Sequence, residues 1–264
     1  MHTLTRRVRM TVNPPDAPSM PDGSHGYAGV PTPVGLGAHY EFAVSVGGTP
    51  DARTGYVLDI KVIDDAARVA LFPALVRASS EGCDRSNPGR WLPAAVLALR
   101  AILPSLRLVQ LRLSPFLSCE VAMSTPDSVT IRQRFDFAAA HRLHVPELSA
   151  EENRALFGKC NNPRGHGHNY QFEPAIAVAA GAPIAVGVIE EACKRVLLDR
   201  FDHKHLNEDC AEFDVSRGGV NPSVENIARV FFGLLRPEVE KIGGAALASI
   251  TVWETDRTSA TYPA

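Results

Sequence analysis

A segment between residues 158 and 172, GKCNNPRGHGHNYQF, concentrates side chains that could do chemistry. His166 and His168 lie two residues apart where a strand-like stretch begins, so both imidazoles should point to one face. His141 ends the preceding strand-like stretch and could reach that face across a hairpin. Three imidazoles without a fourth protein ligand leave an open coordination position, as in catalytic zinc sites. We therefore predict a Zn²⁺ site here, although a lone His-x-His pair is more often an ordinary hydrogen-bonding pair at a sheet edge.

Cys160 precedes the histidine pair across a loop of Gly, Asn and Pro residues. This placement suits a thiolate that is aimed into the site and activated by a neighbouring cation or metal. The alternative is a small, buried, apolar thiol. That alternative fits Cys193, within the helical pattern EEACKRVLL, better than it fits Cys160 among polar loop residues.

Carboxylates further along the chain extend this set. In RFDHKHLNED, Asp202 stands next to His203, and a carboxylate beside an imidazole can hold its tautomer and form a proton relay. Glu254, in VWETD, could accept two hydrogen bonds from a planar pair of N–H groups. A structural Asp-His pair and a solvated carboxylate at a strand end are the ordinary alternatives.

Hydrophobic periodicity indicates the elements that must position these residues. In the first half we expect strands over residues 6–12, 39–46, 56–62 and 106–113, with helices over 64–76 and 93–103. In the second half we expect strands over 129–141, 168–178 and 247–255, helices over 184–201 and 223–235, and a tight turn, AAGAP, over 179–183.

The two halves also share a motif, because GLGAHYEF at 35–42 matches GHGHNYQF at 165–172 in both glycines, the tyrosine and the phenylalanine. With the similar order of elements, this favours an α+β protein made of two duplicated ββααββ units. We place the junction in SCEVAMSTPDSVT, which predicts domains over residues 1–125 and 126–264. Similar element order arising by chance is the alternative.

Composition limits the class of partner. The net charge of -2 offers no basic field for nucleic acid, and no apolar run approaches the roughly 20 residues of a membrane span. The five cysteines show no CxxC spacing, which argues against a disulfide framework or a thiolate zinc site. The start of the chain lacks a leader pattern. We expect a cytoplasmic protein that acts on a small molecule.

From about residue 130 to its end, the sequence resembles 6-pyruvoyl-tetrahydropterin synthase and its relative 6-carboxytetrahydropterin synthase. The motifs FDFAAAHRL, EENRALFGKCNNPRGHGHNY, FDHKHLN, PSVENIA and VWETD carry the resemblance, in that order. It implies a tunnelling fold, in which ββααββ units with helices on one face join their antiparallel sheets into an oligomeric barrel. Active sites would lie between units, and a homo-oligomer is expected.

The resemblance also implies roles for the candidate residues. The metal ligands would be His141, His166 and His168, with Zn²⁺ as the cofactor. Cys160 would be the proton-abstracting thiolate, with Asp202 and His203 as its relay. Glu254 would anchor the pterin ring of 7,8-dihydroneopterin triphosphate, and Ser223 and Glu225, in SVEN, would line the pterin pocket. Lys159, Arg164 and Lys204 are candidates for holding the triphosphate.

The product is left open. The Cys-x5-HGH spacing resembles the 6-pyruvoyl enzymes of biopterin synthesis, whereas the 6-carboxy enzymes of the queuosine route usually have a shorter spacing. Triphosphate elimination is common to both. The first half replaces the HGH histidines by Leu36 and Ala38, so it resembles a degenerate repeat without a metal site. We expect it to supply barrel strands and one wall of the active site.

Two other functions remain open from the residues alone. Three histidines with an open position could equally activate water, as in a zinc hydrolase. A non-catalytic, pterin-binding pseudoenzyme is suggested by the degenerate first half, and the complete set of candidate residues in the second half argues against it.

Overall fold

Residues 1–16, 23–182 and 186–264 are described by the computed structural model of the chain, in which two units can be separated. Unit 1 comprises Met1–Ile131 and Ala177–Ile184, and unit 2 comprises Arg132–Ile176 and Ala185–Ala264. Part of the predicted AAGAP turn and the first two residues of the predicted helix 184–201 lie outside the described residues.

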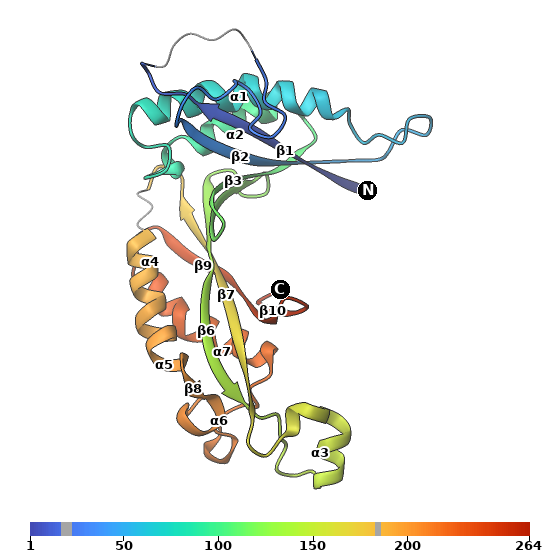
Figure 1. The fold of residues 1–264 in the computed structure, drawn as a ribbon, viewed down its shortest axis with the longest axis vertical. Coiled ribbons are helices and arrows are strands. Elements are labelled where there is room, and N and C mark those ends of the chain that lie inside the picture. The colour runs from blue at the N-terminus through green and yellow to red at the C-terminus, as the bar shows by residue number, and fades with distance from the viewer. Residues whose placement is uncertain (17–22, 183–185) are drawn as a thin grey trace. The chain divides into compact units, whose positions relative to one another are not determined.

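Unit 1 is an antiparallel sheet with two helices on one face (Figure 1). Its elements are β1 (His2–Val12), β2 (Ala38–Gly48), α1 (Ile60–Ser80), the short 3-10 helix η1 (Pro88–Arg90), α2 (Leu92–Ile102), β3 (Leu106–Ser114) and β4 (Leu117–Ala122). The strands pair in the order β1-β2-β3-β4. Alternate residues of β2, among them Tyr40 and Phe42, are fully buried, as are apolar residues of both helices, such as Leu71 and Leu99.

One prediction for this unit is wrong, and one strand was not predicted. The predicted strand 56–62 does not form, because α1 begins at Ile60 and residues before it are irregular. Asp59 has extended backbone geometry and its carboxylate accepts from the Lys61 amide at 2.9 Å, so it acts as a helix N-cap that the apolar alternation concealed. The segment read as a junction opens with strand β4, which no expected element covered.

Unit 2 contains the long hairpin that carries the histidines. Its strands are β6 (Phe135–His141), most of β7 (His166–Ala179), β8 (Lys204–His205), β9 (Ala245–Thr255) and β10 (Thr258–Tyr262), and β5 (Ser128–Gln133) leads into it. Its helical segments are α3 (Ala150–Phe157), η2 (Gly158–Asn161), α4 (Val186–Cys193), η3 (Lys194–Leu198), α5 (Asp199–Phe201), α6 (Leu206–Asp209), η4 (Val215–Arg217) and α7 (Val224–Val239). β6 pairs antiparallel with β7 and parallel with β8, and β9 pairs with β7 and β10.

Phe231 of α7 centres an aromatic core that fixes this helix on the sheet. Its ring centroid lies 5.4 Å from that of Phe137 on β6, 5.5 Å from Phe172 on β7 and 5.0 Å from Phe201 on α5. Buried positions recur along α7 at helical spacing, as the amphipathic sequence pattern predicts. The start of α7 is therefore held close to the end of β6, where His141 lies.

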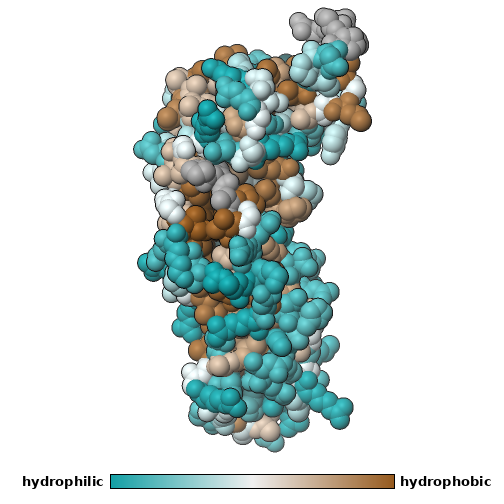
Figure 2. Space-filling view, turned by 90° about the vertical axis from the view of Figure 1, so that its left-hand side faces the viewer, coloured by the Kyte–Doolittle hydropathy of each residue, from teal (hydrophilic) through white to brown (hydrophobic). Residues whose placement is uncertain are grey.

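The predicted α+β class, with antiparallel strand pairs and packed helices, is confirmed. Duplication of one fold and an oligomeric barrel stay predictions. In the part of the chain that the structure describes, no helix combines the length and the apolar character that a membrane crossing requires. The side of unit 2 that carries α4 is mostly hydrophilic (Figure 2).

Candidate active site

The three predicted metal ligands converge at one end of the β6–β7 hairpin. His141 lies directly opposite His166, and His168 lies opposite Ala139, two residues earlier on β6. Directly opposed residues of an antiparallel pair share a face, and residues two apart on a strand do so as well. One coordinating atom from each imidazole lies within 4.8 Å of the others.

His141 is presented as a neutral ligand. Its side chain is fully buried, and its Nδ1 lies 2.7 Å from the carbonyl oxygen of Pro222, just before α7. Nδ1 therefore donates to that carbonyl and leaves the lone pair on Nε2, which lies 3.1 Å from Nε2 of His166. Burial lowers the pKa of His141 to about 4, so the ring is uncharged at neutral pH.

The donor set fits Zn²⁺. His166 Nδ1 and His168 Nε2 are buried without a hydrogen-bond partner, and burial also lowers the pKa of His166. The Nε2 atoms of His141 and His166 also face one another at 3.1 Å, and a cation bound between the rings would compensate nitrogens that lack a hydrogen-bond donor. Imidazole nitrogen is a preferred zinc ligand, and three protein ligands leave room for substrate.

Glu254 of β9 adds a carboxylate to the cluster. Its Oε1 lies 3.4 Å from His141 Nε2 and 3.6 Å from His168 Nε2, and its side chain is 19% exposed. The sequence alternative of a solvated carboxylate at a strand end does not describe this position. A largely buried carboxylate with a free oxygen can accept hydrogen bonds from a ligand that enters the site.

Cys160 lies on η2, in a loop that is fastened to the segment following His141. The carbonyl oxygen of Cys160 accepts from the Leu143 amide at 2.8 Å, and the buried Asn161 side chain donates to the Leu143 carbonyl at 2.7 Å. Gly158, at φ 54°, ends the preceding helix α3 in a conformation that favours glycine. The thiol is thereby held on a short tether next to the end of β6.

The thiol of Cys160 needs a positive charge to ionise. Burial, and secondarily the negative charge of Glu254, raise its pKa above the ordinary thiol value. Burial, and secondarily the charges of Glu254 and Cys160, also raise the pKa of Tyr170. The Tyr170 hydroxyl is buried without a hydrogen-bond partner. The negative charge of Glu254 therefore acts on both the thiol and the phenol. A bound cation would oppose the charge that suppresses the thiolate.

Two supports of the site were not predicted. Helix α3 begins with a capping box, in which Ser149 and Glu152 each bond the other's backbone amide, and Ser-x-x-Glu is a signature that could have predicted it. The Pro222 carbonyl that orients His141 lies 81 residues away in the chain, and no local pattern indicates it.

The second half of the chain, residues 130–264, matches the model of the 6-pyruvoyl tetrahydropterin synthase family. A relative from Homo sapiens, named 6-pyruvoyl tetrahydrobiopterin synthase, is 35% identical over 136 residues, which cover 50% of this chain and 89% of the relative. This chain belongs to the 6-pyruvoyl tetrahydropterin synthase family.

Other family members match the same half. The 6-pyruvoyl tetrahydrobiopterin synthase of Drosophila melanogaster is 33% identical over 144 residues, which cover 53% of this chain and 82% of the relative. The solved structure of the Caenorhabditis elegans 6-pyruvoyl tetrahydropterin synthase is 32% identical, with a TM-score of 0.46, and the match covers 51% of this chain and 94% of that structure.

In this family member, Asp202 and His203 lie beside β6 rather than in the histidine cluster. Asp202 Oδ1 accepts from the Ala138 amide at 2.8 Å, and the His203 amide donates to the Ala138 carbonyl at 2.6 Å. Along β6, Ala138 alternates with Ala139 and points to the opposite face from the histidines. Within one chain, the structure brings the three histidines and Glu254 together, with Cys160 on the adjacent loop, and fastens this pair to the backbone of β6 instead.

The Asp202–His203 pair is itself loose and strained. His203 Nε2 lies 3.9 Å from Asp202 Oδ1, and the His203 side chain is 84% exposed. His203 is the non-glycine residue with a positive φ, 56°, among the described residues. Strained backbone of this kind costs about 1–3 kcal/mol and gathers at functional sites.

The remaining predicted contacts lie at the start of α7 and on loops. Ser223 is the N-cap of α7, and its hydroxyl accepts from the Asn226 amide at 3.4 Å, whereas Glu225 is exposed in the first turn. Ser223 follows Pro222, whose carbonyl bonds His141, and so stands next to that histidine. The triphosphate candidates Lys159, Arg164 and Lys204 are all exposed.

Proposed function

We propose that this protein is a zinc-dependent lyase that acts on 7,8-dihydroneopterin triphosphate, eliminates triphosphate and forms 6-pyruvoyl-tetrahydropterin. The clustering of three imidazoles, with the Glu254 carboxylate beside two of them and Cys160 on the loop fastened next to His141, carries the proposal. Family membership supports it, since matched relatives bear the name 6-pyruvoyl tetrahydrobiopterin synthase. The Cys-x5-HGH spacing favours this product over the 6-carboxy one.

Zn²⁺ would be held by His141, His166 and His168, with the Pro222 carbonyl fixing the tautomer of His141. When bound, it would supply Lewis acidity to oxygens of the substrate side chain. Side chains of the protein would carry out the remaining steps. Burial on the sheet keeps His141 uncharged and rigid, so the ligand geometry is preorganised.

Cys160 would act as the general base. Its thiolate would take a proton from a side-chain carbon of the pterin. The electron pair of that C–H bond would become a carbon–carbon double bond, and triphosphate would leave with the electron pair of its C–O bond. The short loop tether holds the sulfur near the reacting carbon. Later proton movements return the Cys160 thiol to its thiolate form, and Asp202 with His203 would relay them.

The position of this relay pair bears on assembly. Asp202 and His203 lie away from the histidine cluster of their own chain, so we assign them to the site of a neighbouring copy in a homo-oligomer. Residues 1–125 would then serve as a degenerate repeat that supplies sheet strands and a wall. Ser223 and Glu225 would line the pterin pocket, and Lys159, Arg164 and Lys204 would hold triphosphate.

The test is a mass-resolved product assay of the zinc-loaded protein with 7,8-dihydroneopterin triphosphate. We expect stoichiometric release of triphosphate together with a 6-pyruvoyl product. A 6-carboxy product with acetaldehyde would support the elimination of triphosphate but show that the proposed 6-pyruvoyl product is wrong. Absence of turnover in protein that retains zinc would refute the lyase and leave a hydrolase or a pterin-binding pseudoenzyme.

Substitution Glu254→Gln tests the pterin anchor. The amide keeps the shape but loses the charge that accepts from two N–H groups, so we expect KM to rise roughly 10- to 100-fold with a smaller change in kcat. Steady-state kinetics on the zinc-loaded variant measure this. As a control, Glu240→Gln removes an exposed carboxylate that pairs with Arg236 on α7, and should leave both constants unchanged. An unaltered KM in the Glu254 variant would contradict the role.

A further inference from the structure

Unit 1 contains a cavity rich in arginine that the proposed lyase chemistry does not use. It has a volume of about 450 Å³ and lies between the outer strand β1, helix α1 and residues 24–30. Volumes of about 300–1,000 Å³ are usual for small-molecule sites. The basic residues that line it are Arg6, Arg7, Arg9, His25 and Arg68.

The carboxylates near this cavity do not balance its arginines. Asp64 lines the cavity, but its two oxygens accept from Arg6 Nε and Nη2 at 2.8 Å each, so that bidentate pair neutralises itself. Glu41 on β2 is shared by three guanidinium groups, at 3.0 Å from Arg9, 3.6 Å from Arg7 and 3.8 Å from Arg112. An excess of positive charge remains at the cavity.

Arg68 of α1 provides a donor that lacks an acceptor. Its Nε is buried without a hydrogen-bond partner, which leaves the cost of desolvating that N–H uncompensated. The carboxylate near its Nη1 belongs to Asp65, at 3.7 Å, and the Asp65 side chain is 78% exposed. Such a solvated pair contributes little. The Arg68 side chain is 32% exposed and lines the cavity, so the terminal nitrogens of its guanidinium could pair with an anion there.

The outer wall of the cavity is fastened to β1 in advance of any ligand. Arg9 stacks on the Tyr27 ring, 4.3 Å from its centroid, and donates to the Tyr27 carbonyl at 3.2 Å. His25 Nδ1 accepts from the amides of Tyr27 at 3.2 Å and Ala28 at 3.0 Å. Gly29 has φ 84°, and a Cβ there would lie 2.0 Å from the Arg9 carbonyl oxygen, so only glycine fits. A preformed wall reduces the entropy lost on binding.

We propose that this cavity, at the open edge of β1, binds an oligophosphate, with Arg68 of α1 as its main protein ligand and Arg7, which leaves β1 on the face away from α1, as a second contact. Guanidinium groups match phosphate oxygens in planar, two-point contacts, and several of them around one cavity suit an anion with several charged groups. The cavity is larger than a single phosphate needs. The exposed Tyr27 ring at its rim offers a stacking surface for a nucleobase. Free triphosphate and a nucleoside triphosphate share this chemistry.

Calorimetric titration of the zinc-loaded, full-length protein with inorganic triphosphate at low salt tests the proposal. We expect saturable binding that Arg68→Gln and Arg7→Gln each weaken by roughly tenfold or more, through loss of charge-assisted hydrogen bonds. Arg7 is 61% exposed, so its substitution does not threaten folding. His166→Ala should leave this binding in place, which separates it from any phosphate contact at the histidine cluster.

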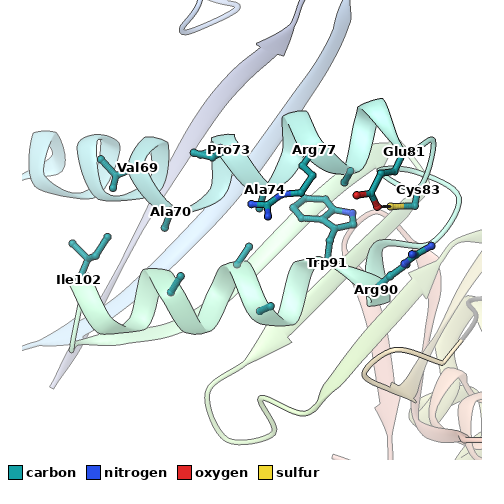
Figure 3. Close-up of a pocket in the computed structure, with 14 residues that line it drawn as sticks. Val69, Ala70, Pro73, Ala74, Arg77, Glu81, Cys83, Arg90, Trp91 and Ile102 are labelled. Carbon is teal, nitrogen blue, oxygen red and sulfur yellow. Dashed lines mark hydrogen bonds between the residues drawn. The ribbon is translucent and has the colours of Figure 1, made fainter.

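Arg90→Gln is the matched control. Arg90 is also exposed and in unit 1, but it lines a different hollow, between α1 and α2 (Figure 3). Its loss should not alter the affinity for triphosphate. A wild-type protein that fails to bind triphosphate, or equal affinities in the Arg68, Arg7 and Arg90 variants, would overturn the proposal.

A second titration with ATP distinguishes a nucleotide ligand from free triphosphate. Tighter binding of ATP than of inorganic triphosphate, reduced to the triphosphate level by Tyr27→Ala, would support a nucleotide as the ligand. Equal binding of both, insensitive to Tyr27→Ala, would support recognition of the phosphate chain alone. Neither result depends on lyase turnover, so failure here and failure of the proposed function can be told apart.

Discussion

Cys160→Ala should lower turnover of 7,8-dihydroneopterin triphosphate by roughly 10²- to 10⁴-fold, because the variant lacks the group that removes the substrate proton. Zinc content should not change, since the thiol is not among the three clustered ligands. Single-turnover measurements of triphosphate release, together with elemental analysis for zinc, check both expectations. KM should change less than kcat, because the sulfur acts on the transition state rather than on binding.

Cys83→Ala is the matched control for this prediction. Cys83 is a buried thiol of unit 1 and takes no part in the proposed chemistry. We expect its removal to leave the rate unchanged. If the Cys160 variant instead kept wild-type turnover, the general-base role would be wrong, and another group near Glu254 would have to take the proton.

His166→Ala should weaken zinc binding by more than about 100-fold, because loss of a direct ligand costs more than loss of a residue that only orients one. Competition titration against a chelator of known affinity measures the change. Turnover should fall in proportion to the zinc lost and recover in part when excess zinc is supplied. A variant that holds zinc as tightly as the wild type would show that His166 is not a ligand.

His39→Ala controls for the general loss of an imidazole. His39 is exposed on β2 of unit 1. Neither β2 nor its partner β1 carries one of the three clustered histidines. Its removal should change neither zinc affinity nor turnover. The contrast matters because buried imidazoles, such as His141, can also lower stability when removed, and a surface histidine separates metal loss from unfolding.

Local patterns were sufficient for the parts of the site that lie on one hairpin. The two-residue period of a strand predicts that His166 and His168 share a face, and the register of β6 with β7 then brings His141 opposite His166. The amphipathic period predicted α7 in the same way. The strand predicted over 56–62 was wrong because apolar alternation there competed with the N-cap Asp59, and the capping interaction prevailed.

By itself, the sequence determined the α+β class, the hairpin with its three imidazoles and the cysteine loop beside them, since each depends on neighbours in the chain. Only the tertiary structure decided that Pro222 orients His141, that Glu254 joins the cluster and that Asp202 and His203 stand outside it. The tertiary structure also decided that the Nε atom of Arg68, beside the arginine-rich cavity, is buried without a hydrogen-bond partner. These contacts join segments far apart in the chain, and burial, which sets the pKa of His141, exists only once those segments have packed.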